Sequence, residues 1–130
     1  MATITKFEDL IAWQEARKLV KMTYSMTSAG ALAKDFGMRA QIQRAAVSAM
    51  TNIAEGFDYE STAEFARFLG FARRSAVEVQ SLLYAALDVE HIKAEIFKTH
   101  YEQAKKTKAL IGGLKQGILK NLRRPSSKSS

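Results

Sequence analysis

Histidine and carboxylate side chains are the groups of this chain that could bind a metal ion or do acid–base chemistry, because the sequence contains no cysteine. A di-iron site in a helical protein needs glutamate–histidine pairs three residues apart that project inward. Neither His91 nor His100 follows a glutamate at that spacing. His91 and Glu95 could hold one metal ion weakly, but we expect them to be a surface pair at a helix start. We therefore predict no metal site and no cofactor.

Other motifs of enzymes are also missing from the sequence. The segment from Gly30 to Gly37 lacks the Lys-Ser or Lys-Thr ending of a phosphate-binding loop, and neither a G-x-S-x-G nor an HExxH motif occurs. Glu55 and Glu78 could form a pair of catalytic carboxylates, but Arg44 nearby favours a structural ion pair. The sequence therefore predicts a protein that is not an enzyme.

Positive charge is concentrated at the C-terminal end of the chain. Residues 1–90 hold ten Lys and Arg against eleven Asp and Glu, residues 91–130 hold ten against two, and the formal net charge is +7. This distribution is typical of proteins that bind polyanions. A solvated basic helix that favours solubility would look the same. The predicted nucleic-acid-binding residues are Lys98, Lys105, Lys106, Lys108, Lys115, Lys120, Arg123 and Arg124.

The elements that must position these residues are helices. Pro125 is the only proline, and apolar residues recur at steps of three and four, which predicts an all-α chain. Short connections favour antiparallel neighbours. We predict an antiparallel up-down four-helix bundle over residues 1–122 and a disordered basic, serine-rich tail over residues 123–130. The four helices are expected to open near residue 5 and to span about residues 35–57, 61–86 and 94–122.

Two pairs of residues have the spacing of a capping box, in which a Ser or Thr side chain accepts a hydrogen bond from a backbone N–H three residues later. Thr5 and Glu8 are predicted to open the first helix, and Ser61 and Glu64 the third.

The third helix carries more apolar surface than one bundle face requires. Its heptad seam consists of Phe65, Leu69, Ala72, Ala76, Val79, Leu83 and Ala86. Phe68, Phe71 and Leu82 lie on a second side. A wide core face would explain them, but we favour an interface with other copies of the chain, because a second apolar stripe needs a second partner.

A polar stripe runs along the second helix, which is otherwise apolar. It consists of Gln41, Arg44, Ser48, Asn52 and Glu55, at steps of three and four. Buried polar groups must be paired, and Ser75 and Glu78 of the third helix are the expected partners. Arg44 is predicted to form an ion pair with Glu78 or Glu55. This polar seam is interpreted as a device that sets helix register, with a ligand site or pore lining as the alternative.

Three segments resemble the 23S rRNA intervening-sequence protein family, whose members are also described as four-helix-bundle proteins. QIQRAAVSAMTNIAEGF, residues 41–57, resembles the family signature QxRRAAxSxxxNIAEG. FEDLIAWQEARKLV, residues 7–20, resembles its FxxLxVWQxAxxL start, and STAEFARFLGFARRSAVEVQSLL, residues 61–83, its SxxEFxRFLxxAxGSxxExxxxL helix. The resemblance covers about residues 5–88, and the three segments follow one another in the same order as in the family.

The resemblance implies a bundle that assembles as a homopentamer around a central channel. Its signature positions correspond here to Trp13, Gln41, Arg44, Ser48, Asn52, Glu55, Gly56 and Glu78. Arg74 stands where the family usually has a glycine, so the local packing should differ. The proline usual between the first two helices is absent, and Gly30 and Ala31 stand there instead.

What the resemblance implies for function is less specific. Family members are often encoded inside insertions of the large ribosomal RNA gene. A related group resembles the accessory variability proteins of diversity-generating retroelements, which bind a reverse transcriptase and its RNA through a basic surface. We expect a basic homo-oligomer that binds RNA or DNA through phosphate contacts of the fourth helix. A reverse transcriptase is a candidate partner. The alternative is a scaffold that docks an acidic protein partner without binding nucleic acid.

The expected location is the cytoplasm, without membrane contact. No apolar run approaches the roughly 20 residues that cross a bilayer, and the first ten residues lack the basic-then-apolar layout of a secretory signal.

Overall fold

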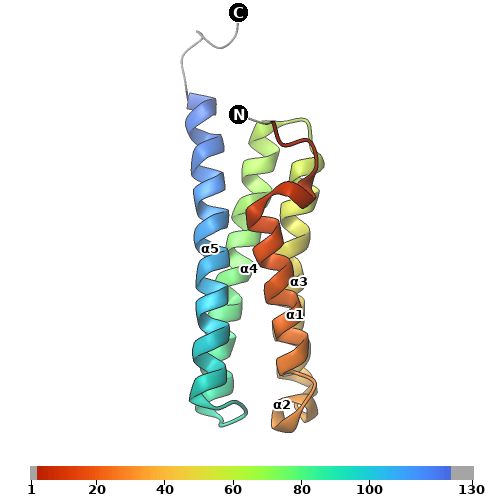
Figure 1. Cartoon of the computed structure of the whole chain (residues 1–130), viewed down its shortest axis with the longest axis vertical. Helices are drawn as coiled ribbons and strands as arrows, with labels where there is room; N and C mark the ends of the chain where they lie inside the picture. Colours follow the sequence, from red (N-terminus) through yellow and green to blue (C-terminus); the bar gives the residue numbers. More distant parts are fainter. Residues whose placement is uncertain (1–2, 124–130) are drawn as a thin grey trace, which may run out of the picture.

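The computed structural model describes residues 3–123, all of whose regular elements are helical. The elements are a 3-10 turn η1 (Phe7–Asp9) and five α-helices, namely α1 (Ile11–Met26), α2 (Gly30–Lys34), α3 (Phe36–Asp58), α4 (Thr62–Asp88) and α5 (Ala94–Arg123). The predicted all-α class is thus confirmed, and the four long helices correspond to the four predicted ones (Figure 1). The predicted tail lies outside the described residues, apart from Arg123, which ends α5.

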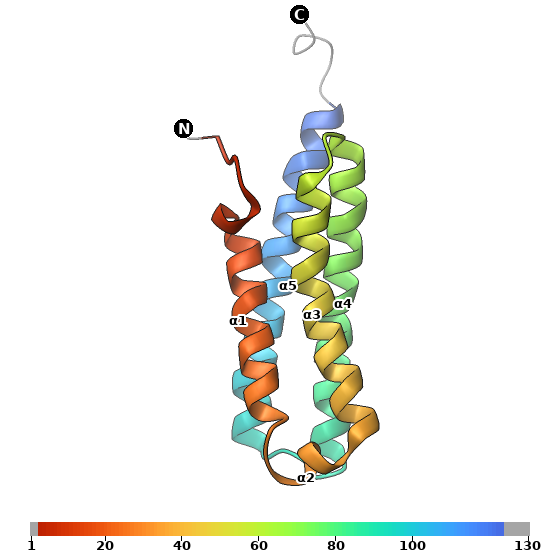
Figure 2. The same ribbon diagram turned by 90° about the vertical axis from the view of Figure 1, so that its right-hand side faces the viewer.

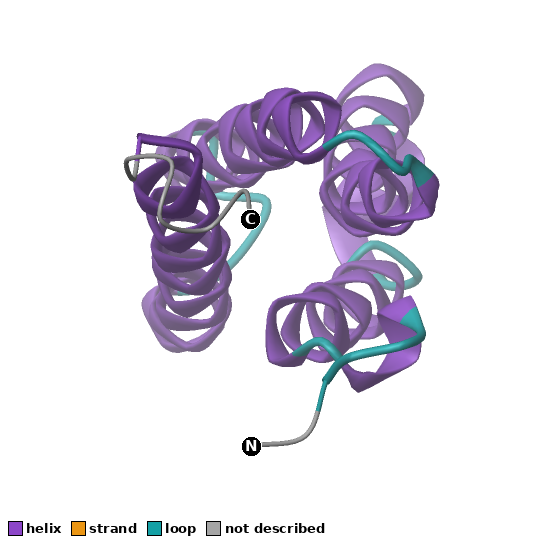
Figure 3. Ribbon diagram, turned by 90° about the horizontal axis from the view of Figure 1, so that it is seen from above, coloured by secondary structure: helices purple, strands orange, loops and turns teal. Residues whose placement is uncertain are grey.

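The long helices alternate in direction and form a four-membered ring. Figure 1 shows α1 and α4 descending while α3 and α5 ascend, with the short α2 at the lower end. The most extensive contacts join α3 to α4 and α4 to α5, and α1 closes the ring against α3 and α5 (Figures 2 and 3). This is the predicted antiparallel up-down bundle of one chain. No helix within residues 3–123 is long and apolar enough to cross a membrane.

The core consists of two apolar clusters stacked along the bundle axis. One gathers around Leu19, Leu32, Ile42 and Leu83, and the other around Trp13, Ile53, Leu69 and Ile111. All members of the predicted heptad seam of α4 are buried, except Phe65, which is half-buried against the second cluster. The 3.5-residue spacing therefore correctly predicted which side of α4 faces the bundle.

The start of α1 differs from the prediction. Thr5 and Glu8 do not open it; η1 comes first, and α1 begins only at Ile11, after Leu10 in an extended conformation with no side-chain cap. Leu10 is buried, and the ring of Phe7 packs 5.1 Å from that of Trp13. The chain bends at this point because burial of these apolar side chains outweighs the capping hydrogen bond that an unbroken helix would gain.

Side-chain caps open the next two long helices, and of these the cap at Ser61 was predicted, whereas the cap at Asp35 was not. A carboxylate oxygen of Asp35 accepts from the backbone N–H of Met38 at 3.1 Å, and the hydroxyl of Ser61 accepts from Glu64 N–H at 3.2 Å. The short helix α2 was not expected. Its first residue, Gly30, has a φ of +67°, which a glycine adopts without strain.

The loops at the lower end of the bundle are joined by a histidine–aspartate contact. The chain leaves α4 through Glu90 at φ +62°, and the His91 backbone N–H then donates to the carbonyl of Ala86 at 2.9 Å. This turn brings His91 Nε2 within 3.0 Å of an Asp35 carboxylate oxygen. The hydrogen bond from Met38 and then that from His91 lower the pKa of Asp35.

Candidate nucleic-acid interface

The polar seam lies at the outer boundary between α3 and α4. Ser48, Asn52 and Ser75 are half-buried there. The Ser75 hydroxyl donates to the Ser48 hydroxyl at 2.8 Å, and the Asn52 amide donates to the Ser48 hydroxyl at 3.0 Å and its carbonyl at 2.9 Å. The predicted partnership of Ser75 with the seam is therefore confirmed, and the Ser75–Ser48 hydrogen bond links α3 to α4.

The predicted ion pair of Arg44 is wrong. Within residues 3–123, Arg44 forms no ion pair with Glu55 or Glu78. All three side chains are exposed, as is that of Gln41. Water solvates these side chains well, so an exposed ion pair would add little to the stability of the fold. The charged half of the seam therefore points outward from this chain.

A cluster of aromatic and arginine side chains covers the outer surface of α4 next to the seam. The ring of Phe68 lies 5.1 Å from that of Tyr59 and 5.6 Å from that of Phe71. The guanidinium of Arg67 lies over both phenylalanine rings and that of Arg74 over Phe71. Neither phenylalanine belongs to a core cluster. We call these five residues the aromatic face.

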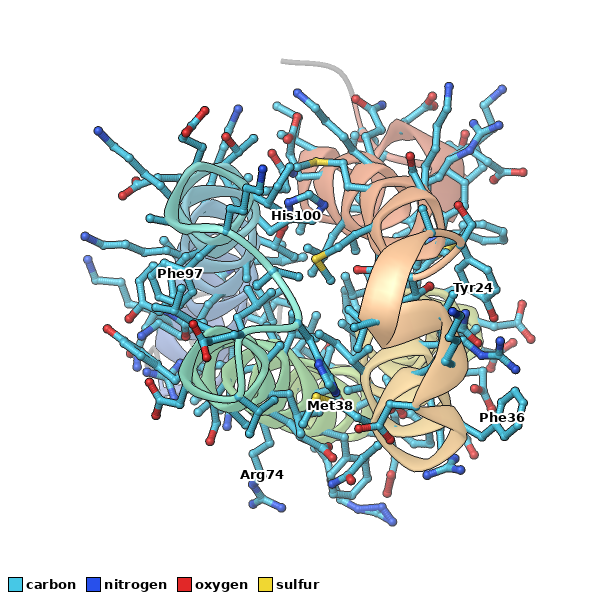
Figure 4. The ribbon with its side chains drawn as sticks, turned by 90° about the horizontal axis from the view of Figure 1, so that it is seen from below. Tyr24, Phe36, Met38, Arg74, Phe97 and His100 are labelled. Atoms are coloured by element: carbon cyan, nitrogen blue, oxygen red, sulfur yellow. The ribbon has the colours of Figure 1, made fainter. Side chains whose placement is uncertain are left out.

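The three predicted interface residues do not lie together. Leu82 is half-buried against the core of its own chain, with Val79 and Ile92 among the residues of that cluster. Phe68 and Phe71 are also half-buried, but they lie on the aromatic face outside both core clusters. Figure 4 shows Arg74 pointing outward from α4 on this side of the bundle. The interface itself stays a prediction, now resting on the two phenylalanines.

The predicted phosphate-contacting lysines differ in their surroundings. Lys98, Lys105 and Lys120 are exposed, and Lys108 and Lys115 are half-buried, with their stems on the protein surface. We call these five the basic face of α5. None of them takes part in an ion pair within the described part of the chain. The side chains of Arg123 and Arg124 lie outside the described residues.

Lys106 has a different role from the other lysines of α5. Its ammonium lies 3.5 Å from a carboxylate oxygen of Glu15 on α1. The same carboxylate accepts from the Gln103 amide at 2.9 Å. This hydrogen bond, with the charge of Lys106, lowers the pKa of Glu15 although partial burial opposes the shift. Lys106 thus links α5 to α1 through an ion pair, although its own side chain is 57% exposed.

A groove between α4 and α5 adds residues that sequence reasoning missed. It measures about 370 Å³ and is lined by Arg73, Gly112, Lys115, Gln116 and Leu119. The side chain of Arg73 crosses over Gly112, and that of Lys115 crosses over Gly70. The two glycines lack side chains that would fill this space. The seven-residue spacing of Gly70, Val77 and Tyr84 on α4 was the available signal in the sequence. It indicates a groove only when the residues of α5 that lie opposite these positions are known.

An aromatic cluster lies on the same face of the bundle, below the groove. The ring of Tyr84 lies 4.8 Å from that of Phe97 and 5.4 Å from that of Tyr101. Phe97 and Tyr101 stack on each other at 5.3 Å and pack against the core. In Figure 4, Phe97 lies at the outer side of the bundle, on a different side from Arg74. Sequence analysis did not assign Tyr84 a role.

The histidines take part in helix packing rather than in a metal site. His100 is buried between α5 and α1, with Nδ1 2.9 Å from the Ile96 carbonyl and Nε2 3.1 Å from the Met22 carbonyl (Figure 4). His91 contacts Asp35 rather than Glu95. Across residues 3–123, no three His, Asp or Glu side chains converge in a way that could hold a metal ion.

An open pocket lies at the upper end of the bundle beside the aromatic face. It measures about 440 Å³ and is lined by Phe7, Ala54, Glu55, Asp58 and Tyr59. Its two carboxylates give it a negative character, opposite to that of the α4–α5 groove. This difference in charge makes the α4–α5 side the better candidate for contact with phosphates.

Comparison with known proteins identifies a family for this chain. The family model of the 23S rRNA-intervening sequence protein matches residues 8–113. The chain belongs to this family. A solved structure from the S23 ribosomal protein family of Bacteroides thetaiotaomicron, of a protein with unknown function, has a similar fold. Its TM-score is 0.73 at 21% sequence identity, over 80% of this chain and 97% of that chain. No curated protein matches the chain.

Membership of the 23S rRNA-intervening sequence protein family confirms the resemblance read from the three segments. Among the signature positions, Ser48 accepts a hydrogen bond from Ser75 of α4 and others from Asn52 within α3, and Gly56 is buried where α3 meets α4. Arg74, which stands where the family usually has a glycine, lies with its guanidinium 5.7 Å from the Phe71 ring. The departure therefore changes the aromatic face and leaves the core untouched.

Proposed function

We propose that this protein is a non-enzymatic homo-oligomer that binds nucleic acid through phosphate contacts on the basic face of α5. The observation that carries the proposal is that five lysines of one helix have no ion-pair partner in residues 3–123. Lysines that neutralise phosphates release condensed counterions, which favours binding without requiring a particular sequence. The excess charge of the whole chain lies in this C-terminal part.

The proposed assembly uses the aromatic face of α4. Phe68 and Phe71 are half-buried apolar side chains outside the core of their own chain, and packing against another copy would remove their remaining exposed surface from water. The resemblance to the family makes a homopentamer the expected assembly. In Figure 4, Arg74 of the aromatic face and Phe97 of α5 lie on different sides of the bundle. Such an assembly would leave the basic face open to a ligand.

The resemblance to accessory variability proteins supports a reverse transcriptase as the protein that brings the nucleic acid. Scaffolding of an acidic protein partner would use the same lysines. The two functions differ in their response to salt, because each phosphate contact adds about 0.7 to 0.9 to the slope of log affinity against log salt.

A charge-reversal variant tests the proposal. Lys98→Glu, Lys105→Glu and Lys108→Glu are combined, and Lys106 is left intact because it pairs with Glu15. The matched control combines Lys18→Glu, Lys21→Glu and Lys34→Glu, three exposed lysines outside α5. Both variants change the net charge by the same amount. Affinity for a labelled 20-nucleotide RNA is measured by fluorescence anisotropy over a series of salt concentrations.

The α5 variant is expected to lose RNA binding while the control keeps most of it, and helicity is expected to be the same in both. Equal losses in the two variants would mean that net charge alone attracts RNA, and the assignment to α5 would be wrong. If the wild-type protein binds no RNA even at low salt, nucleic-acid binding is excluded and the scaffold function takes its place.

A further inference from the structure

We propose that the α4–α5 side of the bundle binds a single-stranded nucleic acid, with Tyr84 stacking on an unpaired base and Arg73 and Lys115 contacting phosphates. This inference rests on the proposed function and narrows its ligand from nucleic acid in general to single strands. It adds two residues of α4, Tyr84 and Arg73, to a site that sequence reasoning placed on α5 alone.

Tyr84 has the exposure and support that a stacking platform needs. Its side chain is 50% exposed, while Phe97 and Tyr101 pack beside it and against the core. A ring held in this way loses little conformational freedom when a base stacks on it. The neighbouring Tyr101 phenol raises the pKa of the Tyr84 phenol above its ordinary value of 10.0. A phenol is neutral at physiological pH even at that ordinary value, so it does not repel a phosphate.

Arg73 and Lys115 form the phosphate-binding part of the site. Each crosses the helix boundary over a glycine of the opposite helix, Arg73 over Gly112 and Lys115 over Gly70. Their charged ends line a groove of about 370 Å³ that also holds the amide of Gln116. Neither cation has an ion-pair partner among the residues that the structure describes. The groove thus offers two cations and an amide to one or two phosphate groups.

The alignment of α4 with α5 places the groove and the aromatic cluster around Tyr84 along one continuous path. Tyr101, Lys108 and Lys115 are spaced by seven residues and lie on one side of α5, as Gly70, Val77 and Tyr84 do on α4. The antiparallel pairing is set by Tyr84 against Tyr101 at one end and Gly70 against Lys115 at the other. Two heptads span about 21 Å, and Lys108 lies midway along this path.

The aromatic face of α4 does not offer an equivalent site. Its arginines lie over its own phenylalanine rings, and Arg67 also forms an ion pair with Glu64. The carboxylates of Glu55 and Asp58 line the pocket beside Tyr59. A phosphate backbone would meet negative charge there, whereas the α4–α5 path combines an open ring with unpaired cations.

Stacking on Tyr84 requires an unpaired base. In a duplex the faces of the bases are covered by their neighbours, and only phosphates and groove edges are available. Proteins that bind single strands combine a positive groove with aromatic rings on which successive bases stack. A duplex could therefore contact the lysines and Arg73 but could not use Tyr84.

Three RNA probes separate stacking from charge. They are a labelled 15-nucleotide single strand, a strand of the same length whose nucleotides are all abasic, and the duplex of the first strand. Each is titrated against the wild-type protein, Tyr84→Ala, Tyr84→Phe and the double variant Arg73→Gln, Lys115→Gln. Tyr24→Ala is the matched control, because Tyr24 is 47% exposed on α1, away from the α4–α5 path.

Tyr84→Ala is expected to weaken binding of the intact single strand by about 5- to 100-fold, the range that one stacked base contributes. Its affinities for the abasic strand and the duplex are expected to stay at the wild-type level. Tyr84→Phe and Tyr24→Ala should bind all three probes normally. The double variant should weaken binding to all three and reduce the salt slope on the single strand by about 1.4.

Equal binding of the intact strand by Tyr84→Ala and wild type would overturn the single-strand inference and leave the proposed function standing. If Tyr84→Ala weakened binding of all three probes by the same factor, the single-strand inference would also be overturned and the proposed function would stand. Absence of wild-type binding to every probe at low salt would instead overturn the proposed function. Tyr84→Leu, which keeps apolar bulk without a π-face, replaces Tyr84→Ala if circular dichroism shows that the alanine variant has lost helicity.

Discussion

At the residue scale, Gly56 shows how closely α3 approaches α4. A Cβ atom at this position would lie 2.6 Å from the Cβ of Phe68 and 3.1 Å from a ring carbon of Phe65. The Phe68 Cβ is attached directly to the α4 backbone, so it cannot move away without moving the helix. The signature glycine is therefore explained by packing at this contact.

Gly56→Ala is expected to lower the free energy of unfolding by about 1–3 kcal/mol, the usual cost of overpacking. Gly113→Ala is the matched control, since no atom lies within 4 Å of a Cβ there. Alanine favours a helix over glycine by up to about 1 kcal/mol, so the control should be neutral or stabilised. Urea unfolding measures both. Equal stability of the two variants would contradict the close approach.

The carboxylate of Asp35 makes the stability of the fold depend on pH at acidic pH. Its pKa lies below its ordinary value of 3.8, because the Met38 N–H and then His91 donate hydrogen bonds to the carboxylate. A lowered pKa in the folded state means that the ionised carboxylate stabilises the fold above pH 3.8. That stabilisation is lost as the pH falls through the lowered pKa.

Asp35→Asn keeps a capping oxygen but has no charge for His91. The wild type is therefore expected to be more stable than the variant at pH 5, and the difference should disappear as the pH approaches 2. Urea midpoints measured between these pH values test this. A difference that stays constant with pH would show that the Asp35 carboxylate does not contribute through its charge.

At the element scale, α1 is attached to α5 through Glu15. The Gln103 amide donates to the Glu15 carbonyl at 3.0 Å as well as to its carboxylate, and the Thr107 hydroxyl donates to the same carbonyl at 3.4 Å. Gln103 and Thr107 are buried. The contact of α1 with its two neighbours is less extensive than that of α4, and these hydrogen bonds add to the attachment of α1.

Gln103→Ala is expected to lower the free energy of unfolding by about 1–2 kcal/mol and to raise the pKa of Glu15 toward its ordinary value. Hydrogen exchange of the α1 amides should become faster, whereas exchange in α3 and α4 should change little. Gln116→Ala, at an exposed position of α5, serves as the control. Unchanged exchange in α1 would mean that apolar packing alone holds this helix.

The helices could be predicted from the sequence because each depends on a local pattern. The heptad seam of α4 and the caps at Asp35 and Ser61 are set by residues within one or two turns. The bend at Leu10 was missed because it depends on distant side chains that bury Leu10. The α4–α5 groove was missed for the same reason, since Arg73 gains its place only when Gly112 of another helix lies beneath it.

At the scale of the whole molecule, two surfaces of opposite character lie on different sides of the ring. The aromatic face carries apolar rings near carboxylates, and the α4–α5 side carries unpaired cations. Assembly through the first would leave the second open in every copy. Several copies would then present many cations to one strand, which strengthens binding by raising the effective concentration of sites.

The central claim, an oligomer that binds nucleic acid by charge, is tested most directly by size exclusion with light scattering at low and high salt, with the nucleic-acid absorbance ratio recorded. We predict a particle of about five times the 14.5 kDa chain mass that carries nucleic acid at low salt and releases it at high salt. Phe71→Glu should shift the particle to lower mass, because it charges the aromatic face without touching the Gly56 contact. A monomer free of nucleic acid at both salt concentrations would contradict the account.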